Sequence, residues 1–399
     1  MGNNIPQGYK ATALGIIPQE WEVMRLGDIV SITSGESPSL YHLKAEGKYP
    51  YVKVEDLNNC EKYQESSREY SDDNNTTIKA GSIIFPKRGA SILNNKVRIA
   101  AKDIQMDSNM MAITPHTAIV DTEFLYIRIL HERLYRIADT SSIPQINNKH
   151  IIPYKIAVPP LAEQRKIAEV LGVWDEAIEK QARLIEKLAL RKRALMQRLL
   201  SAKLRLPGFS EPWKIHKLQE LFTERNETNR TDLPLLSITG DRGVILQTES
   251  EKRDTSNDDK SKYKRIAKGD IGYNTMRMWQ GRSALSGLEG IVSPAYTIVV
   301  PNTTDVDGYY MSVLFKQPRL VYDFWTHSQG LVGDTLNCKY RDFGQVHICC
   351  PPLAEQKAIT EVLTAADREI ELAKEKLERL RRQKRSLMQQ LLTGKKRVI

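Results

Sequence analysis

The sequence of 399 residues is 41% hydrophobic and 27% charged and carries a net charge of +10, which indicates two to four folded domains and excludes a disordered chain. It holds no run of about 18 apolar residues and begins without an apolar stretch, so it predicts neither a membrane span nor a signal peptide. The four cysteines, Cys60, Cys338, Cys349 and Cys350, form no CxxC pair, which argues for a reducing cytoplasm and against structural zinc.

Residues 1–158 are expected to form a globular domain of the α/β (α+β) class. Short β-rich runs at 82–85, 112–114 and 154–158 predict strands, and residues 123–137 form a helix-like stretch between polar loops. The domain carries 18 basic and 18 acidic side chains, so its own charge is balanced.

Two polar loops of this first domain hold residue types that contact nucleic acid. Arg, Lys, Asn and Gln side chains read base edges or clamp phosphates. The candidate DNA-binding residues are Lys87, Arg88, Asn94, Lys96, Gln145 and Asn147. Surface loops are polar in general, so an ordinary solvated loop is the alternative interpretation.

Residues 159–206 predict a long helix that begins at a Pro-Pro pair and stops at Pro207-Gly208. Glu163 lies in its first turn, where a carboxylate is favourable beside the helix N-terminus. Apolar residues recur every seven positions, a spacing typical of a coiled-coil seam. At 1.5 Å per residue such a helix is about 60 Å long.

Residues 207–350 are expected to form a second α/β (α+β) domain, again with 18 basic and 18 acidic side chains. Runs at 296–300 and 346–349 predict strands, and residues 308–320 are helix-like. Its candidate DNA-binding residues lie in two loops that correspond to those of the first domain: Asn274, Arg277, Gln280, Arg282, Asn337 and Lys339.

Residues 351–399 predict a second long helix, which ends at Gly394, and complete an internal repeat. PPLAEQRKIAEVL at 159–171 returns as PPLAEQKAITEVL at 351–363, and 22 of 42 positions are identical over the two helices at an offset of 192. The chain is therefore expected to consist of two homologous halves, each a globule followed by a helix.

Weaker matches extend the repeat into the globules. Trp21 matches Trp213 at the same offset, and IKAGSIIF at 78–85 resembles IAKGDIGY at 266–273. Within the second pair of polar loops, Asn147 and Lys149 resemble Asn337 and Lys339.

The two helical segments hold the whole excess of positive charge. Residues 159–206 carry 11 basic and 6 acidic side chains, and residues 351–399 carry 12 and 7. Solvated helix faces would also account for these charges, but their symmetric placement favours a polyanionic partner.

The two helices are expected to pair as an antiparallel coiled coil with pseudo-two-fold symmetry, because a parallel pair would need a long return connection that the chain lacks. Gln181 and Lys192 interrupt the apolar seam and are expected to set its register. The apolar seam residues are Leu171, Ile178, Ile185, Leu188, Leu195, Leu363, Ile370, Leu377, Leu380 and Leu387.

The sequence lacks the common enzyme motifs. It contains no GxxxxGK[ST] phosphate loop and no GxGxxG, HExxH or GxSxG pattern, and its seven histidines are scattered singly. These observations predict a binding protein with no catalytic site and no metal site of its own.

The two PPLAEQ-led helices, their R-(A/S)-LMQ-LL endings and the Trp-containing segment that opens each globule resemble the specificity (S) subunit of type I restriction-modification enzymes. The resemblance covers essentially the whole chain. It implies two target-recognition domains that each read one half of a split site on double-stranded DNA. It also implies that the coiled coil acts as a spacer and docks two methyltransferase (M) subunits.

The resemblance further implies that the chemistry belongs to partner subunits. The M subunits would carry S-adenosylmethionine, and restriction (R) subunits, where a system has them, would use ATP and Mg²⁺. The chain itself would be non-catalytic, hold no cofactor and act in the cytoplasm.

Two alternative functions stay open. A protein-binding coiled-coil scaffold without DNA contact would show no salt-dependent affinity for DNA. A self-contained nuclease or methyltransferase would be active as the purified chain alone.

Overall fold

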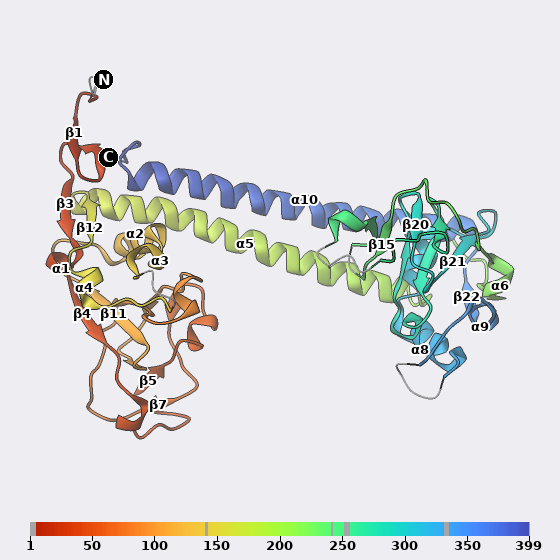
Figure 1. The fold of residues 1–399 in the computed structure, drawn as a ribbon, viewed down its shortest axis with the longest axis horizontal. Coiled ribbons are helices and arrows are strands. Elements are labelled where there is room, and N and C mark those ends of the chain that lie inside the picture. The colour runs from red at the N-terminus through yellow and green to blue at the C-terminus, as the bar shows by residue number, and fades with distance from the viewer. Residues whose placement is uncertain (1–4, 140–142, 241, 251–255, 331–334, 399) are drawn as a thin grey trace. The chain divides into compact units, whose positions relative to one another are not determined.

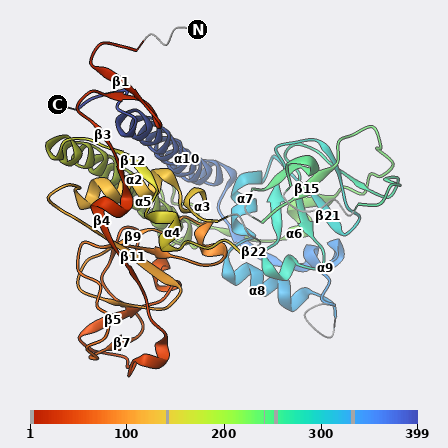
Figure 2. The ribbon, with the colours of Figure 1, turned by 60° about the vertical axis from the view of Figure 1, so that its left-hand side comes forward.

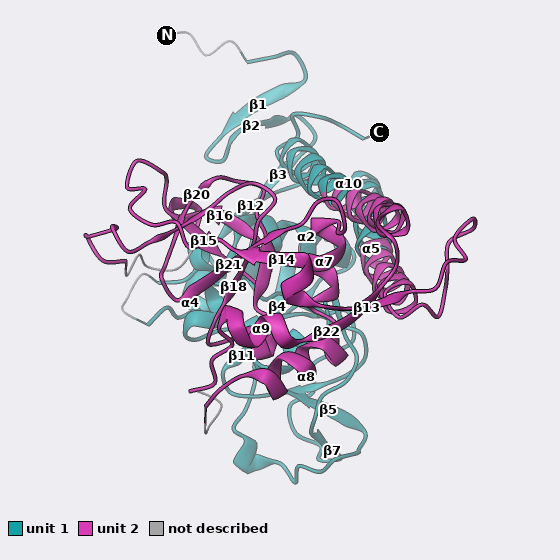
Figure 3. Cartoon of the chain, turned by 90° about the vertical axis from the view of Figure 1, so that its right-hand side faces the viewer, with its two compact units in different colours: residues 1–182, 375–399 teal, residues 183–374 magenta. Residues whose placement is uncertain are grey.

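The computed structural model describes residues 5–139, 143–240, 242–250, 256–330 and 335–398 (Figure 1). The chain divides into two compact units, coloured separately in Figure 3: unit 1 comprises residues 1–182 and 375–399, and unit 2 comprises residues 183–374. Two long helices, α5 (Leu161–Leu199) and α10 (Leu353–Leu392), contribute a part to each unit. Each unit therefore contains one predicted globule together with a part of both helices.

Unit 1 is built around a five-stranded sheet with the strand order β4-β11-β8-β9-β6. These strands are β4 (Val30–Ser34), β6 (Tyr63–Gln64), β8 (Ile83–Pro86), β9 (Arg98–Ala100) and β11 (Met110–Pro115). Four short helices accompany the sheet: α1 (Leu26–Ile29), α2 (Thr122–Glu132), α3 (Leu134–Ile137) and α4 (Asn148–Ile151).

Three smaller sheets complete unit 1. Strands β5 and β7 lie at the end of the unit that is far from α5 (Figure 2). The sheets are the hairpin of β1 (Tyr9–Thr12) and β2 (Gly15–Pro18), the pair of β3 (Glu22–Arg25) and β12 (Lys155–Val158), and the group of β10 (Gln105–Met106), β5 (Tyr49–Val52) and β7 (Tyr70–Ser71).

Unit 2 is built around a four-stranded sheet with the order β14-β21-β18-β19. These strands are β14 (Phe222–Glu224), β18 (Ile271–Asn274), β19 (Ser283–Leu285) and β21 (Tyr296–Pro301). Three strand pairs accompany it: β13 (Lys214–Lys217) with β22 (His347–Cys350), β15 (Leu236–Ile238) with β16 (Val244–Leu246), and β17 (Lys264–Ile266) with β20 (Gly290–Val292). The short helices are α6 (Leu218–Leu221), α7 (Gly308–Leu314), α8 (Pro318–His327) and α9 (Tyr340–Gln345).

The two units share one plan. The order β4-β11-β8-β9 in unit 1 is the order β14-β21-β18-β19 in unit 2. In each globule the strand that follows the opening tryptophan, β3 or β13, pairs antiparallel with the last strand, and the register is the same: Met24 lies opposite Ile156, and His216 lies opposite Ile348. The repeat that is obvious in the helices therefore extends through the globules, although their sequences differ.

The strands predicted at 82–85, 112–114, 154–158, 296–300 and 346–349 are confirmed as β8, β11, β12, β21 and β22. The two helix-like stretches are each broken in two. Arg133, with a φ of 63°, ends α2 before α3 begins. Pro318 starts α8, because a proline has no N–H with which to continue α7.

The two long helices end in the same left-handed turn. Ala202 has a φ of 57° shortly after α5, and Gly394 has a φ of 69° shortly after α10. The predicted end at Gly394 is confirmed. The prediction that Pro207-Gly208 stops the first helix was wrong, because the turn at Ala202 ends it several residues earlier.

Helices α5 and α10 pack antiparallel within each unit. In unit 2, Leu188 packs against Ile370 and Ala373, and Lys192 bonds Asp367 one turn further along. The equivalent ion pair in unit 1 joins Lys384 to Asp175. Of the predicted seam residues, Leu171, Leu188, Leu363, Ile370 and Leu377 are buried and Ile178, Ile185, Leu195, Leu380 and Leu387 are half-buried.

Each globule shares its main hydrophobic core with the ends of both long helices. The helix residues in the core of unit 1 are Ile167 and Leu171 of α5 and Leu391 and Leu392 of α10. Those in the core of unit 2 are Leu199 and Leu200 at the end of α5 and Ile359 and Leu363 of α10. The main core of each globule is therefore completed by the long helices, although each globule also holds a smaller second cluster without helix residues.

Candidate nucleic-acid interface

In both units the two predicted DNA-binding loops lie next to each other. In unit 1 the amide of Ile146 donates to the carbonyl of Lys87 (2.9 Å), and in unit 2 the amide of Cys338 donates to the carbonyl of Thr275 (2.8 Å). Lys87 and Thr275 each follow the same strand of the central sheet, β8 in one unit and β18 in the other. The fold therefore brings together polar loops that are far apart in the sequence.

The first loop of unit 1 begins with two adjacent cations. Arg88 forms a β-bridge with Gln145 of the second loop, so three predicted residues meet there. Burial lowers the pKa of the Lys87 ammonium, and the neighbouring Arg88 lowers it further. An anion placed at this point would relieve both effects.

The other predicted residues of unit 1 lie further along these loops. Asn94 is exposed and Lys96 is half-buried in the turn before β9. Asn147 has a structural role, because it precedes α4 as the capping residue and its backbone N–H donates to Nδ1 of His150 (3.0 Å). The structure thus adds no support for base reading by Asn147.

The second loop of unit 2 corrects one sequence match. Lys339 precedes α9 as Asn147 precedes α4, so these two residues are equivalent. The prediction that matched Asn147 and Lys149 with Asn337 and Lys339 was wrong by two positions, and Asn337 is equivalent to Gln145. The Oδ1 atom of Asn337 is buried and has no hydrogen-bond partner among the described residues.

A polar groove, named here the unit-2 groove, opens between the loop at 274–282 and the end of β15. It consists of two adjoining hollows of about 850 and about 240 Å³. Ile238, Thr239 and Gly240 line both hollows. All four residues predicted in the loop line the groove: Asn274, Arg277, Gln280 and Arg282.

Packing and backbone contacts hold the loop of the unit-2 groove in place. Met278 is fully buried in the core of unit 2. The side-chain oxygen of Asn274 accepts from the amide of Met276 (3.0 Å). Gly281 has a φ of 70°, and a Cβ at this position would lie 3.1 Å from Cγ2 of Val321. The loop therefore presents its polar side chains from a fixed backbone.

Residues from other segments complete the unit-2 groove. Arg242 follows β15, Lys316 lies between α7 and α8, and Tyr296 begins β21. Arg242 and Lys316 add to the positive charge of the loop arginines, which favours a polyanionic ligand. These residues and Gly240 were not predicted from the sequence, because no periodicity or motif links them to the loop.

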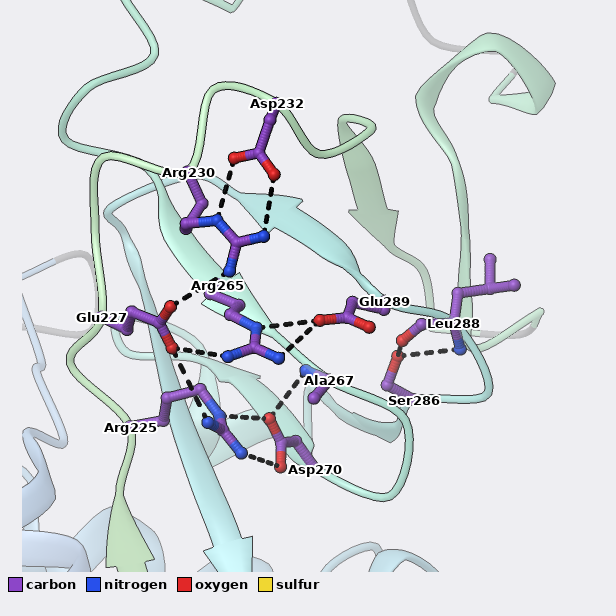
Figure 4. Close-up of polar contacts among 10 residues, drawn as sticks. All are labelled: Arg225, Glu227, Arg230, Asp232, Arg265, Ala267, Asp270, Ser286, Leu288 and Glu289. Atoms are coloured by element: carbon purple, nitrogen blue, oxygen red, sulfur yellow. Dashed lines mark hydrogen bonds and ion pairs between the residues drawn. The ribbon is translucent and has the colours of Figure 1, made fainter.

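A second arginine cluster of unit 2 is structural (Figure 4). Its guanidinium groups are matched by carboxylates in bonds between 2.5 and 3.3 Å. The pairs are Arg225 with Asp270, Arg230 with Asp232 and Glu227, and Arg265 with Glu227 and Glu289. This cluster carries no excess positive charge, so unlike the unit-2 groove it does not attract an anion.

A buried carboxylate ties each globule to a long helix. Glu163 accepts hydrogen bonds from Nε1 of Trp21 (2.9 Å) and Nε of Arg397 (2.6 Å). From the sequence, Glu163 was predicted only as a favourable carboxylate at the helix N-terminus, and this contact was not predicted. The equivalent triad of unit 2, at the offset of 192, is Glu355 with Trp213 and Arg205.

The cations of the long helices fall into two groups. Lys192 and Lys384 bond aspartates of the facing helix, and Arg191 bonds Glu369. Arg193 and Arg198 are exposed near the end of α5 and have no ion-pair partner among the described residues. Exposed cations of this second kind are the ones placed to meet a polyanion.

Other kinds of site find no support in the described part of the chain. No group of three or more His, Cys, Asp or Glu side chains there is placed to hold a metal ion. All four cysteines are free thiols. None of the helices formed by the described residues is long and apolar enough to cross a bilayer.

Comparisons with known sequences point to one family. Residues 18–189 match the model of the type I restriction modification DNA specificity domain. The chain is 25% identical, over 98% of its length and 97% of the relative, to the putative type I restriction enzyme MjaX specificity subunit of Methanocaldococcus jannaschii. It is also 25% identical to the MjaVIII specificity subunit of the same organism, over 96% of this chain and 94% of that one.

Solved structures share the fold. The S subunit of the type I restriction-modification system from M. genitalium is similar with a TM-score of 0.54 and 16% identity, over 98% of this chain and 97% of that one. A chain from a structural study of complex assembly in the type I R-M system has a TM-score of 0.63 and 17% identity, over 95% and 99%. The predicted architecture of two globules and two long helices is therefore confirmed.

Proposed function

We propose that the chain is a specificity subunit of a type I restriction-modification system and that its two globules each read one half of a bipartite, asymmetric DNA target. One observation carries the proposal for unit 2. Four side chains chosen from the sequence for their ability to read bases line a single groove with two further cations. The loops that join at Lys87, Arg88 and Gln145 serve the other half-site.

The chemistry of the unit-2 groove suits base edges. An arginine donates two parallel hydrogen bonds to the O6 and N7 acceptors of guanine, and Asn and Gln bond adenine in a similar way. Arg282, Gln280 and Asn274 supply these groups from one wall. Arg242 and Lys316 supply positive charge for phosphates from other segments.

The coiled coil has a different task in this proposal. It fixes the number of unread base pairs between the half-sites and docks the M subunits, which bring S-adenosylmethionine. R subunits, where present, bring the ATP- and Mg²⁺-dependent chemistry. The chain itself contributes recognition in the cytoplasm and no catalysis.

The test compares a groove arginine with the exposed helix arginines. We expect Arg282→Ala to cost about 1–3 kcal/mol against the cognate target and to relax the preference at one base pair. The double variant Arg193→Ala/Arg198→Ala should weaken binding equally on all sequences and reduce the salt slope by roughly one unit per lost phosphate contact. The measurement is DNA affinity against salt for the complex with its M subunits.

Two results would contradict the proposal. One is an Arg282→Ala variant that loses the same factor in affinity on cognate and half-site-mutated DNA. The other is a continuous or palindromic methylated motif in a host that carries this gene with its partner genes. A complex with no salt-dependent DNA affinity at all would favour the protein-binding scaffold instead.

A further inference from the structure

Gly240 lies directly against the guanidinium group of Arg282. A Cβ built on Gly240 would be 2.9 Å from Nη1 of Arg282 and 3.7 Å from its Cζ, and apart from the two chain neighbours of Gly240 no other described residue lies within 4 Å of that position. Both residues line the unit-2 groove. The guanidinium fork of Arg282 therefore lies in the space that a side chain at position 240 would occupy.

The backbone does not require glycine at this position. Gly240 is absent from the described glycines with a positive φ, unlike Gly243 and Gly281. An alanine at residue 240 can adopt the same backbone without left-handed strain. The residue type at position 240 therefore affects the position of the Arg282 side chain and not the backbone conformation.

Arg282 can respond to a Cβ only by moving its side chain. Its carbonyl accepts from the amide of Asn274 (3.0 Å), and the next residue, Ser283, is buried at the start of β19. The backbone of Arg282 is thus fixed on both sides. A contact of 2.9 Å is shorter than real Cβ contacts allow, so the guanidinium end must shift.

We propose that Gly240 is a specificity-determining residue, which positions the fork of Arg282 to bond the edge of one base, a guanine, in the half-site of unit 2. The inference rests on the proposed function of the groove. Paired hydrogen bonds to a base edge need donor–acceptor distances of about 2.7–3.2 Å and nearly linear geometry. A displaced fork keeps its charge but loses this alignment, so base preference falls while attraction to phosphates persists.

The experiment uses Gly240→Ala in the complex with M subunits. Gly287→Ala is the matched control, because Gly287 also has an ordinary φ and a Cβ there would meet nothing within 4 Å. We expect Gly240→Ala to weaken cognate binding about 5- to 150-fold, the range that corresponds to losing one bidentate base contact. Thermal stability and the salt slope should equal those of the control.

A double-mutant cycle tests whether Gly240 acts through Arg282. We expect Gly240→Ala to have no further effect in the Arg282→Ala background, and little in the Arg282→Lys background, where the fork is absent. Additive losses, or a Gly240→Ala complex with unchanged base preference, would overturn the inference while leaving the groove as the reading site. An Arg282→Ala complex with unchanged base preference would instead overturn the proposed function of the groove.

Discussion

The two units follow one plan, but only unit 2 is a continuous stretch of chain. Unit 2 runs from residue 183 to residue 374, whereas unit 1 is assembled from residues 1–182 and 375–399. At the helix end in unit 2, the chain leads from α5 through a short connection to Trp213. At the equivalent place in unit 1, Trp21 and the residues after α10 lie on separate segments that contacts alone must hold together.

In unit 1, side-chain hydrogen bonds link the globule to the end of α10. The hydroxyl of Tyr9, in hairpin strand β1, donates to the carbonyl of Gly394 (2.9 Å). The guanidinium of Arg128 donates to the carbonyl of Leu392 (2.7 Å). Arg128 lies seven residues after Asp121, which caps α2. The residue at the same distance from Asp307, which caps α7, is Leu314, whose side chain has no hydrogen-bond donor.

The difference is visible in the packing around the equivalent tryptophans. Trp21 is 0% exposed, whereas Trp213 is half-buried and lines an open hollow of about 380 Å³ together with Leu314. In unit 2 the peptide chain itself connects α5 to Trp213, so the packing around Trp213 can be looser. Unit 1 lacks that connection and reaches the same arrangement through buried polar bonds.

The largest expected effect comes from removing the helices. The fragment 207–350 lacks four buried core side chains, Leu199, Leu200, Ile359 and Leu363. At about 1.5–3 kcal/mol each, this loss is about 6–12 kcal/mol, as large as the stability of a typical domain. We expect 207–350 to remain unfolded and 183–374 to fold, as measured by near-UV circular dichroism and hydrogen exchange. A cooperative transition in 207–350 would refute the shared core.

The second prediction changes the residues that distinguish the two junctions. Arg128→Leu removes a buried cation from Glu132 (2.7 Å) and should cost unit 1 about 3–5 kcal/mol. Leu314→Met alters the equivalent residue, a buried core residue of unit 2, without removing a polar bond, and should cost unit 2 less than about 1.5 kcal/mol. Hydrogen exchange resolved by segment reports each unit separately, which a single unfolding curve does not. Equal costs would show that the connection does not replace contacts.

The third prediction concerns the left-handed turns. Gly394→Ala introduces a residue that disfavours its φ by about 1–2 kcal/mol, with a Cβ 2.3 Å from Cδ of Pro18. Ala202→Gly relieves the same conformational strain in unit 2, so it should stabilise that unit by up to about 1 kcal/mol. Thermal denaturation of the two variants checks the opposite signs, and a stable Gly394→Ala chain would contradict the tight contact with Pro18.

The smallest effect is expected from the aspartates of the coiled coil. Asp367 bonds Lys192 and also accepts from the hydroxyl of Tyr309 (2.6 Å), whereas Asp175 bonds Lys384. Asp367→Ala should therefore cost about 1 kcal/mol more than Asp175→Ala, the value of one hydrogen bond. Urea denaturation of the two variants measures the difference, and a larger loss for Asp175→Ala would show that the tyrosine bond adds nothing.

The sequence predicts the frame of this protein well because the frame is repetitive. The seven-residue spacing and the offset of 192 identify both helices and the antiparallel seam. Lys192 and Lys384, which interrupt that seam, are accounted for by aspartates at the same offset in the facing helix. Regular patterns of this kind follow from helix geometry alone.

The candidate site is predicted only in part. The loop residues from Asn274 to Arg282 are found from their type and their place after a strand. Gly240 and Lys316 are not, because their proximity to the loop arises from tertiary packing. Ala202 illustrates the same limit for the backbone, since an alanine gives no sequence signal for a left-handed turn.

The discontinuity of unit 1 has a consequence for biosynthesis. A ribosome that adds about 5–20 residues per second needs about 10–40 s between residue 182 and the Arg397 that bonds Glu163. During that interval unit 2 can emerge and fold as one continuous stretch, while unit 1 still lacks its second segment. The half of the protein that is translated first is therefore the half that is completed last.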